Sequence, residues 1–209
     1  MIALLAGIAV IVAALGPWTD AAADRTLVAH MVQHMALTLV AAPLLVIGLS
    51  GRRLLRRLPR RVGRRLVRLA SPLLAWVVFV GTQWATHFTG FYERAAQNGG
   101  IHLLEHELFL VTAVVFWWQA LGSPSRLRGI WRIVYVGSAM QATMAVGIVL
   151  LTSDHVFYRH YPSLAGQHSA GALMWVVGSL LMVGLLLLVA WEWLQGEERR
   201  AVAREAYGR

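Results

Sequence analysis

Apolar residues run along most of the chain in long segments, separated by short polar connections that contain glycine and proline. The apolar segments are residues 2–16, 26–49, 70–88, 101–121, 130–152 and 168–194. All but the first are long enough to cross the hydrocarbon core of a bilayer as a helix of about 20 residues. The pattern predicts an all-α integral membrane bundle of about six transmembrane helices. Residues 1–209 are expected to form a single membrane domain.

The first apolar segment, residues 2–16, is shorter than the others and has two readings. It precedes Ala21-Ala22-Ala23, which resembles a cleavage site, so the segment has features of a signal peptide. It lacks the basic residues that normally open a signal peptide. We therefore expect it to be retained as a span.

Proline and glycine predict two features inside the spans. Pro43 lies within the second span, where it should kink the helix. Small residues recur in the last two spans, and Gly147 and Gly171 are examples. Such residues are expected to allow close packing of these two helices.

Composition excludes several classes of protein. Hydrophobic residues make up 58% of the 209 positions and charged residues only 14%, which rules out a disordered basic chain. The chain has no cysteine, so disulfides, thiolate metal sites and cysteine nucleophiles are excluded. The formal net charge is +9, and all 19 basic residues are arginine.

The arginines are distributed asymmetrically and thereby predict the orientation. Sixteen of the 19 fall on one side of the predicted bundle. Nine lie in the connection 51–69, three lie around the start of the fifth span, and four follow the last span. Only Arg25, Arg94 and Arg159 fall on the other side. Because cytoplasmic loops are enriched in basic residues, we expect a multi-pass protein of the bacterial cytoplasmic membrane with both termini cytoplasmic. The Arg-rich connection is expected to contact anionic lipid headgroups, not nucleic acid.

With this topology, every histidine falls on the outer, extracytoplasmic side. The eight histidines are His30, His34, His87, His102, His106, His155, His160 and His168. Polar groups at membrane depth are costly and usually functional. The clustering predicts a shared site for a metal or haem at the outer end of the bundle.

Two histidine pairs have helical spacing. His30 and His34, like His102 and His106, are four residues apart, which places each pair on one helix face. Imidazole suits copper and zinc, and the neighbouring Met31 and Met35 would add a preference for Cu(I). The same spacing of Met140 and Met144 is more typical of packing. The candidate metal ligands are His30, His34, His102, His106, His168 and His87.

Acidic residues accompany the histidines on the outer side. Glu105 lies three residues after His102 and shares its helix face, whereas Glu107 points away. We expect Glu105 to orient a ligand histidine or to bind the metal itself. Asp154 is a further candidate. Acids outnumber arginines on this side, so the outer mouth should attract a cation.

The segment from His102 to His106 is also a literal H-x-x-E-H, the pattern of a family of zinc proteases in which the glutamate is the general base. Zinc-dependent hydrolysis within the membrane is therefore an alternative function. Paired axial histidines offer a second alternative, a haem-binding membrane protein.

Several elements together resemble the polytopic CtaG family of cytochrome c oxidase assembly proteins. The pattern His30-Met31-Val32-Gln33-His34 followed by Pro43 resembles its H-M-x-Q-H…P-L-L motif. The other matching elements are His87 with Tyr92, His102 to His106 with Phe116 and Trp117, and Gln167 to Gly171 with Met174 and Trp175. The resemblance covers about residues 26–195.

The resemblance implies copper handling at the outer face by His30, His34, His102 and His106. It also implies a copper-binding assembly factor, not an enzyme, that helps to metallate a haem-copper oxidase. Its partners would be an oxidase subunit or a copper donor or acceptor protein. The sequence departs from the family pattern at Gly166, where the family has aspartate, with Asp154 or His168 as possible replacements. Members also commonly carry another span before the first one.

Overall fold

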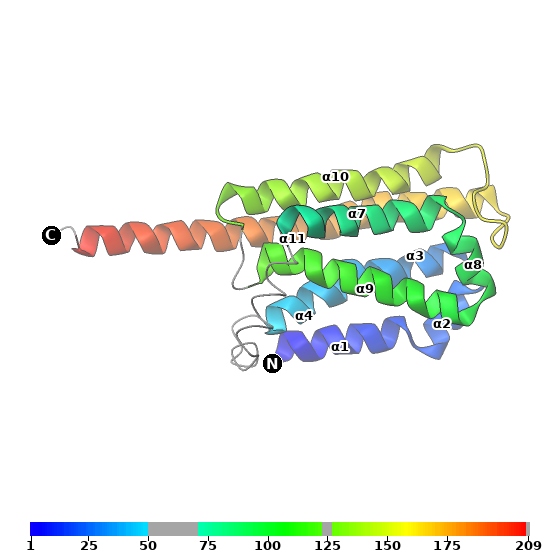
Figure 1. The fold of residues 1–209 in the computed structure, drawn as a ribbon, viewed down its shortest axis with the longest axis horizontal. Coiled ribbons are helices and arrows are strands. Elements are labelled where there is room, and N and C mark those ends of the chain that lie inside the picture. Colours follow the sequence, from blue (N-terminus) through cyan, green and yellow to red (C-terminus); the bar gives the residue numbers. More distant parts are fainter. Residues whose placement is uncertain (50–70, 123–126, 208–209) are drawn as a thin grey trace.

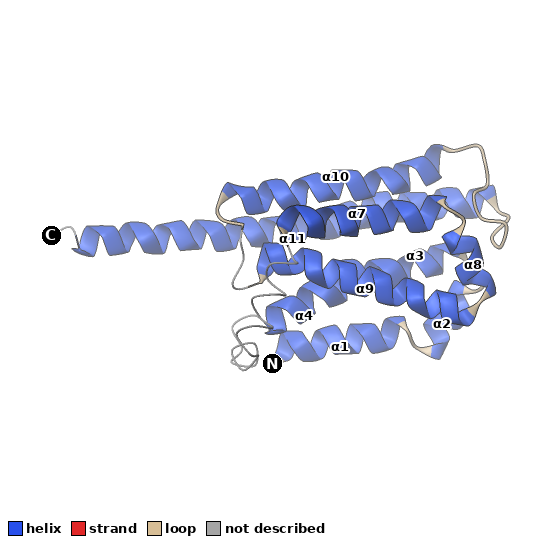
Figure 2. Ribbon diagram, viewed as in Figure 1, coloured by secondary structure: helices blue, strands red, loops and turns tan. Residues whose placement is uncertain are grey.

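The computed structural model describes residues 1–49, 71–122 and 127–207. Within these ranges the secondary structure is helical and there is no strand (Figure 2). The helices are α1 (Ile2–Ala14), α2 (Pro17–Ala23), α3 (Leu27–Met35), η1 (Ala36–Ala41), α4 (Ala42–Leu49), α7 (Pro72–Phe88), α8 (Phe91–Gln97), α9 (Gly99–Leu121), α10 (Ile130–Thr152) and α11 (Leu164–Tyr207). The all-α prediction is confirmed for this part of the chain.

All six predicted apolar segments are helical, but the expected count of six spans is not confirmed. Four described helical segments are long and apolar enough to cross a membrane: Leu27–Leu49, Gly99–Leu121, Ile130–Thr152 and the helix that begins at Leu164. A fifth results if α1 and α2, bent by 51° at their junction, are counted as one span. The remaining segment, α7, has 17 residues and reaches only about 26 Å at 1.5 Å per residue.

The long helices run side by side as a bundle (Figure 1). Both chain ends lie toward the same end of this bundle, and the C-terminal part of α11 projects beyond it. The short helices α2 and α8 lie at the opposite end, together with the loop that joins α10 to α11. The Arg-rich connection 51–69 and Arg126 lie outside the described residues, so the orientation that they predict is not tested by the fold.

Side-chain caps set the starts of three helices. The Thr26 hydroxyl accepts a hydrogen bond from the Ala29 amide at 3.2 Å, and Ser71 caps α7 in the same way. Asn98 Oδ1 accepts from the amides of Gly100 and Ile101, which begins α9. These caps satisfy amides that have no partner within the helix. Two of them, on α3 and α9, fix the helices that carry the histidine pairs.

A π-helical segment, η1, lies between α3 and α4 and ends at Ala41, two residues before Pro43. Proline has no amide hydrogen and its ring crowds the preceding turn, which disrupts the regular helical hydrogen bonds at this point. The wider π turn accommodates this disruption within one continuous span. The carbonyl of Thr38 in η1 accepts a hydrogen bond from Trp117 Nε1 at 2.8 Å. The perturbation expected at Pro43 thus takes the form of a π segment braced by α9.

Glycines permit the close approach of α10 and α11, as expected. A Cβ on Gly171 would lie 2.6 Å from the carbonyl oxygen of Gly147 and 2.5 Å from the amide of Leu151. In contrast, Gly137 and Gly184 face open space. The apolar core itself contains Phe79, Phe116 and Trp117 among its largest fully buried side chains.

Candidate metal centre

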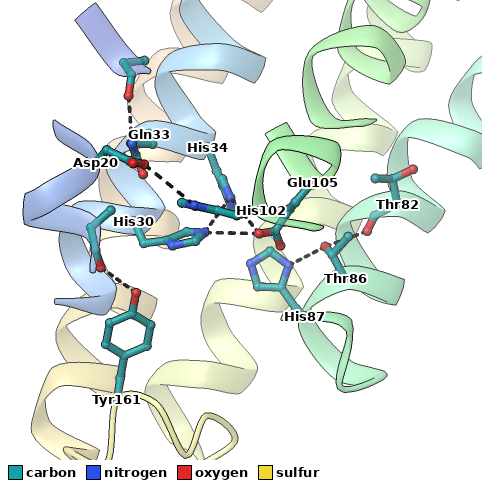
Figure 3. A network of polar contacts seen from close by, with 12 residues as sticks. Asp20, His30, Gln33, His34, Thr82, Thr86, His87, His102, Glu105 and Tyr161 are labelled. Atoms are coloured by element: carbon teal, nitrogen blue, oxygen red, sulfur yellow. Dashed lines mark hydrogen bonds and ion pairs between the residues drawn. The ribbon is translucent and has the colours of Figure 1, made fainter. Parts of the chain in front are cut away.

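The predicted histidine pairs meet at the end of the bundle that carries α2 and α8. His30 and His34 project from α3, and His102, Glu105 and His106 project from α9. Figure 3 shows His30, His34, His102 and Glu105 pointing toward one another. We call these five residues the imidazole–carboxylate cluster: His30, His34, His102, Glu105 and His106.

Two sets of ligand atoms in the cluster are close enough to hold one metal ion. His30, His34 and His106 form one set, and His30, His102 and Glu105 form the other. Within each set, the atoms lie within 4.8 Å of one another. His30 belongs to both sets, so the cluster is one connected group of donors from two helices.

Two of these imidazoles already contact each other. His30 Nε2 and His34 Nε2 are 2.8 Å apart, a hydrogen-bond distance at which one ring donates and the other accepts. Two nitrogen ligands of a tetrahedral ion at about 2.0 Å would be about 3.3 Å apart. The pair would therefore have to open by about half an ångström to hold one ion. A small rotation of either side chain is enough for this.

Glu105 is the most unusual member of the cluster. Its side chain is 0% exposed, and neither carboxylate oxygen accepts a hydrogen bond from the described residues. Oε2 lies 3.5 Å from His30 Nε2 and 3.9 Å from His34 Nε2. An ionised carboxylate without hydrogen bonds or a cation is very costly to bury. The geometry therefore favours a bound positive charge beside Glu105.

His87 on α7 lies next to the cluster and has the form of a prepared ligand. Its Nδ1 is 2.7 Å from the carbonyl oxygen of Gln83, which can only accept, so Nδ1 carries the proton. Nε2 is then an unprotonated nitrogen, buried and without a partner among the described residues. Histidine ligands commonly donate their second nitrogen to a carbonyl in this way. The His87 ring is centred 6.3 Å from that of His34.

His102 provides the least buried edge of the cluster. Its side chain is 13% exposed, and Nδ1 lies 3.8 Å from Oδ1 of Asp20, which is half exposed on α2. An exposed carboxylate beside a partly exposed imidazole can attract a cation and pass it to buried donors. This edge is the route of access that the geometry indicates.

Three tyrosines cover the cluster, and two of them were not anticipated from the sequence. The ring of Tyr92 is centred 4.6 Å from that of His30 and 4.5 Å from that of Tyr158, while the Tyr161 hydroxyl donates to the carbonyl of Ala23. Burial raises the pKa of Tyr161 to about 12, and burial likewise raises the pKa of Tyr92 and Tyr158. All three phenols stay neutral. In the sequence, Tyr92 was noted only as part of a family motif. Tyr158 and Tyr161 could have been found from their position in a loop that also carries histidines.

The other sequence candidates lie outside both ligand sets. His168 Nε2 is 2.9 Å from the carbonyl oxygen of Ser153, and Asp154 is exposed in the loop between α10 and α11. Their assignment as ligands stays a prediction. Met31 is fully buried and Met35 partly buried, and both line a cavity that also contacts His34 and His87.

The H-x-x-E-H element does not form a separate ligand group among the described residues. His102 and His106 fall in different sets, and each set is completed by His30 from α3. The zinc-protease scheme requires both histidines of the motif on one ion, with the glutamate free to act as base. The observed groups instead include Glu105 among the possible ligands.

Comparisons with known proteins identify relatives along the whole chain. It is 28% identical to uncharacterized proteins of Mycobacterium bovis and Mycobacterium tuberculosis, over 98% of this chain and 35% of each relative. An uncharacterized protein of Mycobacterium leprae is 26% identical over 85% of this chain and 31% of its own length. The chain thus spans about a third of the length of these curated relatives. No solved structure is significantly similar to it.

A family model gives a more specific result. The model of the cytochrome c oxidase caa3 assembly factor family (Caa3_CtaG) matches residues 1–196, a range that includes the whole imidazole–carboxylate cluster. The resemblance of the histidine motifs to the CtaG family is confirmed by this match. The chain belongs to the cytochrome c oxidase caa3 assembly factor family.

Proposed function

We propose that the protein binds copper in the imidazole–carboxylate cluster and helps to metallate a haem-copper cytochrome c oxidase. Membership of a cytochrome c oxidase assembly family supports the oxidase as the recipient. Imidazole is a ligand that copper favours, and the glutamate supplies a negative charge to a cation. The copper is cargo in this scheme, and the protein performs no chemical conversion.

One observation carries the proposal: the Glu105 carboxylate is fully buried, has no hydrogen-bond partner within the part of the chain that the structure describes, and faces two imidazole nitrogens within 4 Å. This arrangement is costly unless a cation is bound or the carboxylate is protonated. A divalent ion held by the imidazoles would remove that cost. A merely structural carboxylate would be expected to accept hydrogen bonds from nearby donors.

We propose that all six apolar segments cross the cytoplasmic membrane of a bacterium, with both termini inside and the cluster near the outer surface. The arginine distribution supports this orientation through the positive-inside rule. The short α7 would cross where the bilayer thins locally or where neighbouring helices shield its ends. A copper donor outside the cell membrane would then reach the cluster past His102 and Asp20.

Metal analysis of the purified protein in detergent tests the copper site. We expect about one Cu(II) per chain bound at the cluster, lost in His106→Ala and kept in the matched control His155→Ala, whose side chain is exposed in the loop. Haem would add a strong visible absorption band. If protein purified from cells supplied with both metals contained zinc and not copper, this would favour the hydrolase alternative. Copper retained at full occupancy by His106→Ala would refute the assignment of the cluster.

The role in assembly requires a second measurement in cells. The native gene is replaced by the His106→Ala or His155→Ala form, and the copper content and activity of the haem-copper oxidase are measured in membranes. We expect both to fall with His106→Ala and to remain normal with His155→Ala. Normal oxidase in both strains, with the His106→Ala protein present in the membrane, would contradict a role in metallation.

A further inference from the structure

A cavity of about 40 Å³ lies beside the imidazole–carboxylate cluster, between α3, η1, α7, α10 and α11. A water molecule needs about 10–15 Å³ measured in this way, so an ion of similar size fits easily. Five of the seven methionines of the chain line it. These are Met31, Met35, Met144, Met174 and Met182.

Two of the surrounding helices, α11 and α7, each contribute a stripe of side chains to the cavity. On α11 the stripe is Met174, Gly178 and Met182, at intervals of four residues, and on α7 it is Phe79, Gln83 and His87. A Cβ on Gly178 would lie 3.9 Å from the terminal methyl groups of both Met35 and Met144. The terminal methyl groups of methionines from two helices, α3 and α10, therefore meet at one point on α11 that has no side chain of its own.

A polar contact holds one of the donors at the cavity. The hydroxyl of Ser179 lies 2.9 Å from Met144 Sδ and restrains the thioether. The unprotonated Nε2 of His87 is buried and has no partner in the described ranges, and His34, which belongs to the cluster, also lines the cavity. A His34 nitrogen, Nδ1, is likewise unpartnered among the described residues. Both orphaned nitrogens indicate a ligand in or beside this space.

The chemistry of the lining selects the class of ligand. Thioether sulfur is a soft donor that favours Cu(I) over divalent ions. Among the described residues that line the cavity there is no carboxylate, so no lining side chain offsets the second charge of a divalent cation. The neighbouring cluster differs in this respect because it contains Glu105. Methionine also fills irregular gaps in cores, but this explanation leaves the cavity and the free imidazole nitrogens unaccounted for.

We propose that this methionine-lined cavity is a second metal site that takes Cu(I) and is joined to the imidazole–carboxylate cluster through His34. The inference extends the proposed copper function and rests on it for the identity of the metal. The cluster receives copper at the partly exposed His102 edge. Copper that arrives as Cu(I) passes by way of His34 into the cavity, which holds it between the helices with no change of oxidation state, since thioethers favour Cu(I).

The test is an anaerobic titration of the full chain in detergent with Cu(I), in competition with a coloured Cu(I) chelator. We expect two Cu(I) per chain for the unmodified protein. Met35→Leu with Met144→Leu should remove one, and Met140→Leu should remove none because Met140 does not line the cavity. Methionine and leucine have similar volumes, so these variants are expected to fold. X-ray absorption should detect sulfur neighbours of copper in the unmodified protein and lose them in the double variant.

A second pair of variants fills the cavity without removing a donor atom. Gly178→Val places its methyl groups at the convergence of Met35 and Met144, and we expect it to lose one Cu(I). Gly184 lies on the same helix and faces open space, so Gly184→Val is the matched control and should keep two Cu(I) per chain. A single Cu(I) per chain with only nitrogen or oxygen neighbours, or two Cu(I) retained by both cavity variants, would overturn the inference.

The outcomes separate this inference from the proposed function. His106 belongs to the cluster and does not line the cavity. The His106→Ala protein should therefore lose the divalent ion and keep sulfur-bound Cu(I). If the cavity variants have no effect while His106→Ala loses copper, only the second site is wrong. If His106→Ala has no effect while the cavity variants lose Cu(I), the cluster assignment is wrong and the cavity stands.

Discussion

Replacing Glu105 by glutamine tests the central electrostatic argument because the change preserves shape and removes one negative charge. The carboxylate is fully buried and lies within 4 Å of two imidazole nitrogens, the position that a bound cation would share. At 4 Å and an effective dielectric constant of about 20, one pair of unit charges contributes about 4 kcal/mol. This corresponds to a loss of about 1,000-fold in metal affinity. A role limited to orienting a histidine would cost only about 10–100-fold.

The same substitution should have the opposite effect on the metal-free protein. Without metal, the buried carboxyl group is either ionised without a partner or held in its protonated form, and both states cost free energy, so a neutral glutamine should leave the fold equally stable or more stable. At a metal concentration 100-fold above the dissociation constant, binding stabilises the unmodified protein by about 2.7 kcal/mol. With affinity reduced 1,000-fold, the stabilisation falls below about 0.1 kcal/mol. The substitution is therefore predicted to preserve or raise the stability of the metal-free protein and to abolish the stabilisation that added metal provides.

Thermal unfolding in detergent, followed by tryptophan fluorescence with and without Cu(II), measures both effects in one experiment. Glu107→Gln is the matched control, since Glu107 is exposed two residues further along α9. We expect Glu107→Gln to behave like the unmodified protein. Full metal-induced stabilisation in Glu105→Gln, or a metal-free variant that unfolds at a lower temperature, would refute the reasoning.

Three further predictions concern packing, the cover of the cluster and topology. Gly171→Ala should destabilise the protein by about 1–3 kcal/mol because the added methyl group meets the α10 backbone. The control Gly184→Ala places its methyl group in open space and should leave the stability unchanged, and unfolding in detergent measures both variants. Tyr161→Phe removes the hydrogen bond to α2, so it should cost about 0.5–1.5 kcal/mol and increase the reaction of the cluster histidines with diethyl pyrocarbonate. In this cysteine-free chain, Gln97→Cys should react with an impermeant maleimide in intact cells and Arg200→Cys only after lysis; the reverse would contradict the proposed orientation.

Hydropathy predicted the positions of the long helices because membrane spans must be apolar along their length. The bounds of α10 agree with the prediction at Ile130 and Thr152. The same criterion could not find α2 and α8, whose seven residues each are too short and too polar to register. It also placed the end of the last span at residue 194, whereas α11 continues to Tyr207. A helix can leave the bilayer and continue through polar residues with no signal in hydropathy.

For the site, the spacing of histidines predicted which residues meet but not how they meet. Pairs four residues apart on two helices were expected to converge, and His30, His34, His102 and His106 do so. The unsatisfied state of Glu105 and the free nitrogen of His87 depend on distances between helices, which the sequence does not contain. The cavity was out of reach for the same reason. Met31, Met35, Met144 and Met174 had been noted separately, with no indication that they line one cavity or that Gly178 leaves room between Met35 and Met144.

The membership of His30 in both candidate ligand sets bears on the rate of the proposed copper transfer. An ion held by His30, His102 and Glu105 can reach His34 and His106 by exchanging one ligand at a time while its bond to His30 persists. Such stepwise exchange avoids an ion without ligands in a space of low dielectric constant, which would be the state of highest free energy during transfer. The site would then release its ion at a rate set by single ligand exchanges. Tight binding and rapid delivery are compatible in a protein built in this way.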